Sequence, residues 1–301
     1  MVNTPSQSHF VKKVRRQRRW IAIAAASCIV LGACFLAHAG HPFRFIVFDV
    51  GEGDSLFLEA PNGQQMLIDG GPTNGVLEKL GRAMPSFDRS LDIIVLTHPD
   101  ADHLTGLVEV VRRYRIGQIL FTGVQDSTAT YQTFLALLLE RDVRTTSVVA
   151  GDTVSFGGAT LTILAPFASW QDREAKEMNN TGIVSRLDYR AFSLLLTADV
   201  DTTVESALVR ASSNLQATVL KVGHHGSKFS TSAALLSAVQ PQLAVISVGE
   251  KNTFGHPSQE TLGRLADQHI PILRTDQGGD ITIESDGNGF TTTRGIRLRI
   301  W

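Results

Sequence analysis

The sequence has little cysteine, and none in most of its length. Its two cysteines, Cys28 and Cys34, both lie in an apolar stretch near the N-terminus. The region that follows therefore has neither a disulfide nor a thiolate metal ligand. Such a region is indifferent to the redox state of its compartment, which is compatible with a location outside the cytoplasm.

A second long hydrophobic run is also lacking. After residue 39 no segment is apolar enough to span a bilayer, so the chain does not form a multi-helix channel by itself. Low-complexity linkers and short-period repeats are absent as well. With 43% hydrophobic and 19% charged residues, the composition excludes disorder, collagen and a disulfide scaffold, and it suits globular domains.

An excess of charge is lacking overall, but the charge is unevenly distributed. The 301 residues carry a net charge of −1, yet residues 1–39 hold six basic residues and no acidic one. Residues 40–301 hold the remaining 22 basic residues against 29 acidic ones, a net charge of −7. A domain this acidic is not expected to bind nucleic acid non-specifically over its whole surface. Any contact with DNA or RNA needs a local basic surface or bound metal.

The N-terminus has the pattern of a membrane-targeting segment. Residues 1–19 are basic and residues 20–39 are apolar, the charge order of a signal or of a helix whose N-terminus stays in the cytoplasm. Three outcomes fit: a single-pass anchor, cleavage at the small-x-small motif of residues 37–39, or a lipoprotein with Cys34 lipidated. We expect the uncleaved anchor, because the apolar run continues through Phe35 and Leu36 and ~20 apolar residues suffice to span a bilayer. All three outcomes place the remaining chain outside the cytoplasm, as an inner-membrane, lipoprotein, periplasmic or secreted domain.

Strands and helices alternate from residue 43 onward. Short β-type runs recur at residues 43–50, 55–59, 65–69, 91–96, 118–121, 146–150, 159–164, 183–189, 192–197, 218–222, 243–248, 280–284 and 295–300. Helical patterns occupy residues 76–84, 104–115, 129–141, 231–239 and 258–268. The polar segment 168–181 is predicted to be a loop. This alternation predicts one α/β domain over residues 43–301, with two sheets between layers of helices.

The first candidate metal-binding loop directly follows the apolar run 91–96. It contains His98, Asp100, Asp102 and His103, four potential ligands within six residues. Two carboxylates this close together need a cation or strong donors nearby. A solvated polar loop is the alternative, but the density of ligands after a buried strand favours metal binding.

The second candidate loop follows the apolar run 218–222 and contains His224 and His225 between glycines. Paired histidines in such a turn can bring one imidazole to a metal while the other faces substrate, and the sequence does not say which is the ligand. Between the two loops, Asp199 ends the apolar run 192–197 and is interpreted as a carboxylate that bridges two metals. Its alternative is a turn or helix cap, a role that Asp201 or Thr202 can also fill.

Together these motifs resemble the metallo-β-lactamase fold, and more narrowly the soluble nuclease-like domain of ComEC-type DNA-uptake proteins. The resemblance spans about residues 43–285 and implies a four-layer αββα sandwich. The matching stretches are Asp49–Ser55, Leu67–Gly71, His98–His103, Asn179–Asn180, Ala198–Asp199, Leu220–Gly223, His224–Ser227 and Gly255–Pro257. The chain departs from that family's usual pattern at Glu52 (usually Gln), Gly182 (usually Ser) and Ala198 (usually Gly). It also lacks the polytopic channel of the true uptake proteins.

The resemblance implies two divalent metal ions, Zn²⁺ or Mn²⁺. One would take His98 and Asp100, the other Asp102 and His103, with Asp199 bridging them and His225 (or His224) completing the second site. In the wider fold a further histidine binds the first metal near residues 179–181, where this chain offers the amide of Asn180. Carboxylates and an amide in that set favour Mn²⁺ or Mg²⁺ over Zn²⁺ alone.

Further residues receive roles around the metals. Asp69 is expected to accept a hydrogen bond from a liganding imidazole, and its alternative is a turn residue. The predicted catalytic residues are His256, His224 and Asp102; His256 is assigned to the scissile phosphate or leaving group, with a surface turn as the alternative. Lys221 is a candidate phosphate contact, and its alternative is an ordinary edge lysine.

The sequence thus predicts a membrane-anchored, extracytoplasmic metallohydrolase that cleaves phosphodiesters, with DNA as the substrate by resemblance. The same loops also resemble those of phosphorylcholine esterases, so small or cell-envelope phosphoesters are the enzymatic alternative. A non-catalytic DNA-binding accessory of an uptake system is the alternative from another class. The expected partners are DNA or another phosphodiester, the cytoplasmic membrane through residues 20–39, and DNA-uptake machinery.

Overall fold

The computed structural model describes residues 41–211 and 214–292, the backbone of residues 297–299, and Trp20, Ile21, Ile23, Ala24 and Ser27. The chain divides into two units, Met1–His41 and Pro42–Trp301. No helix within the described residues is long and apolar enough to cross a membrane. The predicted anchor over residues 20–39, with its processing sites, falls largely outside the described residues and stays a prediction.

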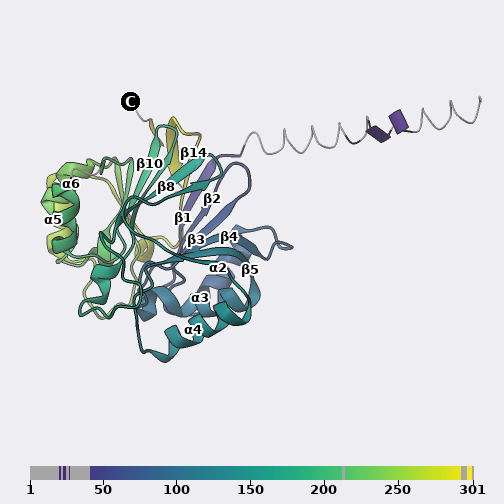
Figure 1. Cartoon of the computed structure of the whole chain (residues 1–301). Coiled ribbons are helices and arrows are strands. Elements are labelled where there is room, and N and C mark those ends of the chain that lie inside the picture. The colour runs from purple at the N-terminus through teal and green to yellow at the C-terminus, as the bar shows by residue number, and fades with distance from the viewer. Residues whose placement is uncertain are drawn as a thin grey trace, which may run out of the picture. The chain divides into compact units, whose positions relative to one another are not determined.

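The described strands of the second unit form two sheets (Figure 1). The nine-stranded sheet has the order β16-β15-β14-β1-β2-β3-β4-β5-β6, and the seven-stranded sheet has the order β13-β12-β11-β10-β9-β8-β7. The first consists of β1 (Phe43–Val47), β2 (Leu56–Glu59), β3 (Gln65–Ile68), β4 (Ser90–Val95), β5 (Arg115–Phe121), β6 (Thr145–Ser147), β14 (Ile281–Ser285), β15 (Gly289–Thr292) and β16 (Arg297–Arg299). The second consists of β7 (Thr153–Phe156), β8 (Ala159–Ala165), β9 (Val184–Tyr189), β10 (Phe192–Leu196), β11 (Val219–Lys221), β12 (Leu243–Ile246) and β13 (Ile272–Arg274).

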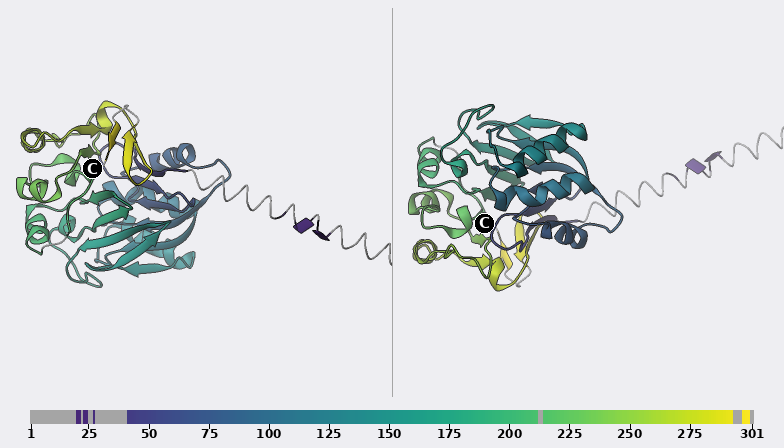
Figure 2. Two further views of the ribbon diagram at one scale, coloured as in Figure 1. Left: turned by 90° about the horizontal axis from the view of Figure 1, so that it is seen from above. Right: turned by 90° about the horizontal axis from the view of Figure 1, so that it is seen from below.

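Helices cover the outer faces of the two sheets (Figures 1 and 2). The helices are α2 (Gly75–Ala83), α3 (Ala101–Arg113), α4 (Ala129–Glu140), α5 (Thr202–Arg210), α6 (Ala233–Val239) and α7 (Gln259–Asp267). The first three pack on the larger sheet and the last three on the smaller one. Single 3₁₀ turns occur at η1 (Met178–Thr181), η2 (Gly223–Gly226) and η3 (Thr275–Gln277).

Each sheet is buried on both faces. Phe45 and Val47 of β1 join a core between the sheets, whereas Ile46 packs under helices α2 to α4. The same alternation places Leu194 of β10 between the sheets and Leu195 under the helices of the smaller sheet. Because side chains of a strand alternate between faces, apolar runs of this kind produce two sheets sandwiched between helices. The predicted four-layer arrangement is confirmed.

The sequence pattern predicts none of α5, β7, β13 and β15. The three strands have only three or four residues, too short for a periodicity to be read. Helix α5 begins with two threonines and a valine, which have modest helix propensity. The predicted loop 168–181 is irregular up to η1 at its end.

The parallel strands bring the predicted loops to one edge of the sandwich. Strand β3 pairs in parallel with β4, and β10, β11 and β12 pair in parallel in the other sheet. Each loop that carries a predicted ligand directly follows one of these strands. Loops at the carboxyl ends of neighbouring parallel strands meet at the same edge, which is where α/β proteins place their sites.

Helix α3 lies directly against the turn that follows β3. The backbone N–H of Gly70 donates to the carbonyl of His103 at 2.7 Å, and that of Gly106 donates to the carbonyl of Gly71 at 3.0 Å. A Cβ atom at Gly106 would collide with the carbonyl oxygen of Gly70. The missing side chain of Gly106 therefore permits the contact that fixes the first turn of α3.

We expect Gly106→Ala to lower the free energy of unfolding by about 1–3 kcal/mol, because the backbone must move to admit a methyl group. The matched control is Gly81→Ala in helix α2, where the new Cβ meets nothing within 4 Å. That change should raise stability by roughly 0.5–1 kcal/mol. Urea unfolding of the two variants measures both effects, and equal stabilities would contradict the tight contact.

Candidate metal centre

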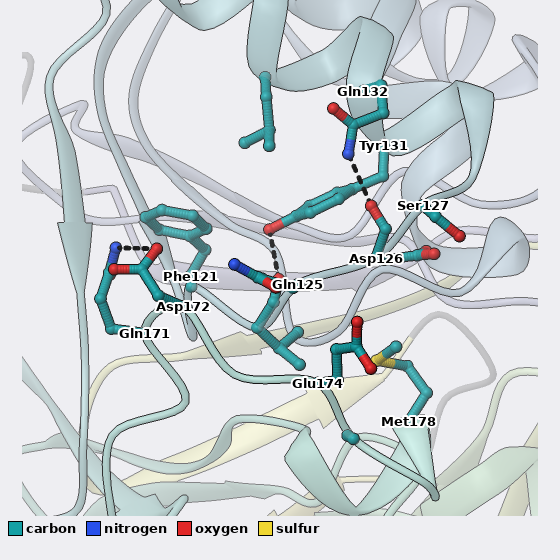
Figure 3. A pocket seen from close by; sticks show the side chains of 14 residues that line it. Phe121, Gln125, Asp126, Ser127, Tyr131, Gln132, Gln171, Asp172, Glu174 and Met178 are labelled. Atoms are coloured by element: carbon teal, nitrogen blue, oxygen red, sulfur yellow. Dashed lines mark hydrogen bonds between the residues drawn. The ribbon is translucent and has the colours of Figure 1, made fainter.

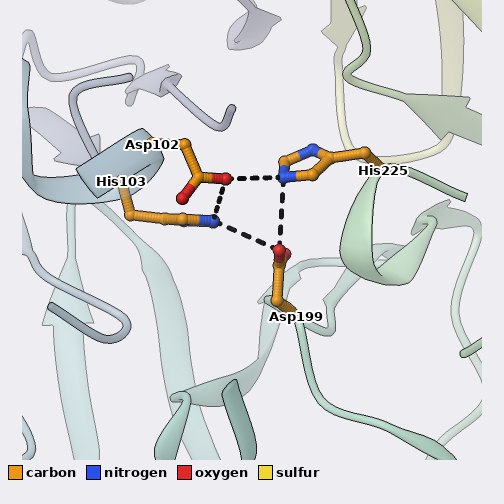
Figure 4. A group of neighbouring side chains, drawn as sticks. All are labelled: Asp102, His103, Asp199 and His225. Carbon is orange, nitrogen blue, oxygen red and sulfur yellow. Dashed lines mark hydrogen bonds and ion pairs between the residues drawn. The ribbon is translucent and has the colours of Figure 1, made fainter. Parts of the chain in front are cut away.

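Two histidines and two aspartates converge at this edge of the sandwich (Figure 4). The Nε2 atom of His103 is 3.5 Å from Oδ2 of Asp102 and 3.3 Å from Oδ2 of Asp199. The Nε2 atom of His225 is 3.2 Å from each of the same two oxygens. Ligand atoms about 2.1 Å from one ion lie roughly 3.0–3.4 Å apart in octahedral or tetrahedral geometry. The four atoms thus have the spacing of a metal coordination sphere.

His98 and Asp100 lie beside this group. The rings of His98 and His103 have centroids 4.1 Å apart, and Nε2 of His98 is 3.7 Å from Oδ2 of Asp100. His98 is buried, whereas the Asp100 side chain is 40% exposed at the mouth of the site. The structure therefore brings all six predicted ligands together. His225 lies within the cluster, while Nε2 of His224 is 4.0 Å from Asp199.

The Nδ1 atom of each clustered histidine faces an acceptor in the protein. That of His103 donates to Oδ2 of Asp69 at 2.8 Å, and that of His225 donates to the carbonyl of Ser247 at 3.0 Å. The hydroxyl of Thr97 donates to Asp69 at 2.7 Å and is left to accept from Nδ1 of His98 at 2.9 Å. These contacts orient each ring so that its Nε2 faces the cluster, the usual arrangement of metal-binding histidines.

Buried polar atoms without a hydrogen-bond partner mark the place of an ion. Among the described residues they include Nε2 of His98, Nε2 of His103 and Oδ1 of Asp199. Leaving such atoms unpaired in a protein interior is costly, and a cation removes that cost. The residues present therefore fit a divalent metal, because they are oriented imidazoles and carboxylates and three of their buried polar atoms have no hydrogen-bond partner.

Burial and the neighbouring charged groups shift the pKa values of the cluster. Burial, and then the neighbouring His103, lower the pKa of His98 to about 3, so its lone pair is available at neutral pH. Burial would lower the pKa of His103 and His225, but Asp199 and the other carboxylates outweigh it and hold both pKa values well above the usual range. Burial and the neighbouring Asp102 raise the pKa of Asp100 to about 6.

Several residues at the site have a strained backbone conformation. His224 and His225 have φ of 47° and 51°, and Ala198 has φ of 46°, all in the left-handed region. Such conformations cost energy in residues other than glycine and cluster at functional sites. The positive φ at Ala198 also explains why the related family usually has glycine there.

A cavity of about 560 Å³ opens over the cluster. Its lining consists of Glu52, Pro72, Asp100, Ala101, Asp102, Asn179, Asp199, His224, His225, Phe254 and His256. The predicted catalytic residues His256, His224 and Asp102 therefore all face this space. Of the asparagine pair, Asn179 lines the cavity, whereas the amide oxygen of Asn180 accepts the backbone N–H of Asp201 at 3.0 Å.

The structure places Lys221 away from this cavity. Its side chain is only 1% exposed, and its ammonium group contacts Oδ2 of Asp54 at 2.8 Å. Burial raises the pKa of Asp54, but Lys221 and His225 outweigh it and lower the pKa to about 2. Strand β11 lies inside the sheet, so Lys221 is not an edge lysine, and its ammonium is not free to hold a phosphate. It neutralises a carboxylate that lies 3.5 Å from Nδ1 of His225.

Three contributors have no role in the sequence prediction. Asp54 stands within a matching stretch and Thr97 directly before one, but nothing in their spacing reveals the buried partners they meet. Glu52 is marked only by its departure from the family pattern; its Oε1 accepts from Nδ1 of His256 at 2.9 Å and its Oε2 accepts from the N–H of Gly249 at 3.0 Å.

Comparison with known proteins assigns the class. Residues 48–250 match the model of the metallo-beta-lactamase superfamily, and the chain belongs to this family. Its members are metal-dependent hydrolases, and this chain is related to competence proteins. It is 29% identical over 252 residues to ComE operon protein 3 of Bacillus subtilis, covering 78% of this chain and 32% of that protein. It is 30% identical over 260 residues to competence protein ComA of Neisseria gonorrhoeae, covering 85% and 34%.

The chain spans about a third of the length of these curated relatives. Among solved structures it is similar to the metallo-beta-lactamase fold protein YhfI of Bacillus subtilis, with a TM-score of 0.57 and 12% identity. That match covers 81% of this chain and all of the other.

We expect Asp199→Ala to lower the divalent metal bound per chain, because Asp199 contacts both clustered histidines and is buried among them. The matched control is Asp201→Asn, which keeps the helix-capping oxygen two residues away and should bind metal like the wild type. Elemental analysis after Mn²⁺ loading and desalting measures both. Unchanged metal occupancy in Asp199→Ala would show that Asp199 is not a metal ligand.

Proposed function

We propose that this protein is a membrane-anchored, extracytoplasmic phosphodiesterase that uses two divalent metal ions, Zn²⁺ or Mn²⁺, and acts on DNA. The observation that carries the proposal is the shared position of Asp199. Asp102, His103, Asp199 and His225 have the spacing of one ion's ligands, and His98 and Asp100 provide further ligands directly beside them. Residues 20–39 would supply the anchor.

The lining of the cavity could accept a phosphodiester only together with bound cations. Glu52, Asp100, Asp102 and Asp199 contribute four carboxylates, and no lysine or arginine is among the lining residues. A phosphodiester anion would be repelled from this cavity unless bound cations reversed its charge. Two divalent ions held there would neutralise the phosphoryl oxygens and lower the pKa of an attacking water.

The lining of the cavity supplies no hydroxyl, thiol or amine nucleophile. No serine, threonine, cysteine or lysine is among the residues that line the cavity. This supports hydrolysis by water rather than through a covalent enzyme intermediate.

His256 is suited to the leaving group. Glu52 accepts the proton on its Nδ1, and the side chain of Asn252 holds its backbone N–H at 3.0 Å and its carbonyl at 2.8 Å. The ring is therefore fixed from behind, and its Nε2 is left for the cavity. In this role the imidazole would carry a proton on both nitrogens, and Nε2 would donate its proton to the departing oxygen or a hydrogen bond to the phosphate. His224, half-buried on the same wall, would contact the substrate from the metal side.

DNA is the substrate we favour because one of the curated relatives is named a competence protein. The decisive experiment is hydrolysis by the purified protein, with Mn²⁺ or Zn²⁺, of single-stranded DNA, double-stranded DNA, RNA, bis-p-nitrophenyl phosphate and nitrocefin. We expect metal-dependent cleavage of DNA and bis-p-nitrophenyl phosphate, and none of nitrocefin. Cleavage of bis-p-nitrophenyl phosphate but not of DNA would favour small or cell-envelope phosphoesters as the substrate. Binding of DNA without any hydrolysis would favour the accessory role.

We expect His256→Ala to keep its metals and its fold but to lose about 10²- to 10⁴-fold in phosphodiesterase rate. Glu52→Gln should retain more activity than Glu52→Ala, because an amide oxygen can still accept the Nδ1 proton of His256. Steady-state rates with elemental analysis of the same preparations separate the effects. Wild-type turnover in fully metallated His256→Ala would show that His256 is only a residue of a surface turn. Loss of metal from this variant would show that His256 is a metal ligand.

A further inference from the structure

Phe254 is an exposed aromatic side chain at the mouth of the metal centre. It is 71% exposed and is one of the residues that line the 560 Å³ cavity. The other large hydrophobic residues that are exposed in the described part of Pro42–Trp301 do not line this cavity: Phe87, Leu139, Phe167 and Phe229. Because its ring lines the entrance of the cavity, Phe254 is placed to contact a substrate there.

The ring of Phe254 is supported from one side. It lies nearly parallel to the ring of His256, with centroids 5.8 Å apart and an interplanar angle of 19°. His256 is itself fixed by Glu52 and Asn252. Phe254 thus extends a stack that begins beside the metal cluster and ends in solvent, so a further planar ring can be added to it.

Neither of the two cavities provides a cationic track for a nucleic-acid backbone. The metal-site cavity has four carboxylates and no lysine or arginine in its lining. A second cavity of about 630 Å³, whose lining includes Met178 next to Asn179, has three carboxylates, Asp126, Asp172 and Glu174, and again no lysine or arginine (Figure 3). Within these linings, the exposed ring of Phe254 offers a substrate an uncharged contact.

We propose that Phe254 is a stacking subsite for a nucleobase attached to the scissile phosphate, and that the substrate is an unpaired strand or a strand end. This inference rests on the proposed phosphodiesterase function and names the substrate that it takes. In a duplex each base is already stacked and paired, so reaching Phe254 requires the base to be extruded, whereas an unpaired base can stack at little cost.

The test compares an oligothymidylate, an abasic chain of the same length with the same phosphates, and the oligothymidylate paired with its complement. The full-length protein and Phe254→Ala, Phe254→Trp and Phe229→Ala are used. Phe229 is the matched control, because it is 63% exposed but does not line the cavity. KM is measured with Mn²⁺, and the dissociation constant is measured by fluorescence anisotropy with Ca²⁺ in place of Mn²⁺.

We expect Phe254→Ala to weaken binding of the oligothymidylate about 5- to 150-fold and to leave the abasic chain unchanged. Phe254→Trp and Phe229→Ala should bind like the wild type, and the duplex should bind more weakly than the single strand. If Phe254→Ala weakened binding of the base-bearing and abasic chains equally, the proposal would be overturned, because Phe254 would then act only by supporting His256. So would a wild-type protein that binds both chains equally well.

The two proposals fail in different ways. A wild-type protein that cleaves DNA without any preference for bases would refute the stacking subsite and leave the phosphodiesterase. A protein that hydrolyses no phosphodiester but binds the base-bearing chain through Phe254 would refute the phosphodiesterase and leave the subsite.

Discussion

The metal centre depends on one buried carboxylate, that of Asp69. Its two oxygens accept the backbone N–H and the hydroxyl of Thr97 and the Nδ1 proton of His103. Asp69 is itself held in the left-handed region, with φ of 59°. A carboxylate buried this deeply is tolerated only with such donors, and each donor is fixed in return. The ends of β3 and β4 are joined in this way, and His98, through Thr97, and His103 are aimed at one point.

A second buried charged group, the ammonium of Lys221, connects the smaller sheet to the site. Lys221 is buried at the end of β11 and pairs with Asp54, which belongs to the loop after β1 of the larger sheet. The hydroxyl of Ser247, which follows β12 of the smaller sheet, also donates to the carbonyl of Gly53 at 2.7 Å. Within the larger-sheet half, the N–H of Asp54 donates to the carbonyl of Asp102 in α3 at 3.2 Å. Breaking a buried ion pair from one side is strongly destabilising, so this pair holds the two halves of the site in register.

Much of this could be read from the sequence, because the signals are local. An apolar run that ends in closely spaced histidines and aspartates predicts both a buried strand and candidate metal ligands, as with His98 to His103. The contacts that support the ligands are not local. Glu52 and His256 are 204 positions apart, and only the folded chain shows that they meet. The sequence misplaces Lys221 for the same reason: a lysine at a strand end is expected to be exposed, and its buried partner Asp54 is apparent only in the folded chain.

The central claim is that the side chains around Asp199 form a metal centre, and anomalous diffraction from crystals grown with Mn²⁺ tests it most directly. The account predicts two peaks about 3.5–4 Å apart, one on each side of Asp199, with His98 and Asp100 at one and His103 and His225 at the other. A single peak would contradict the binuclear centre. The absence of any peak at these residues, in protein that binds Mn²⁺ elsewhere, would contradict the metal centre itself.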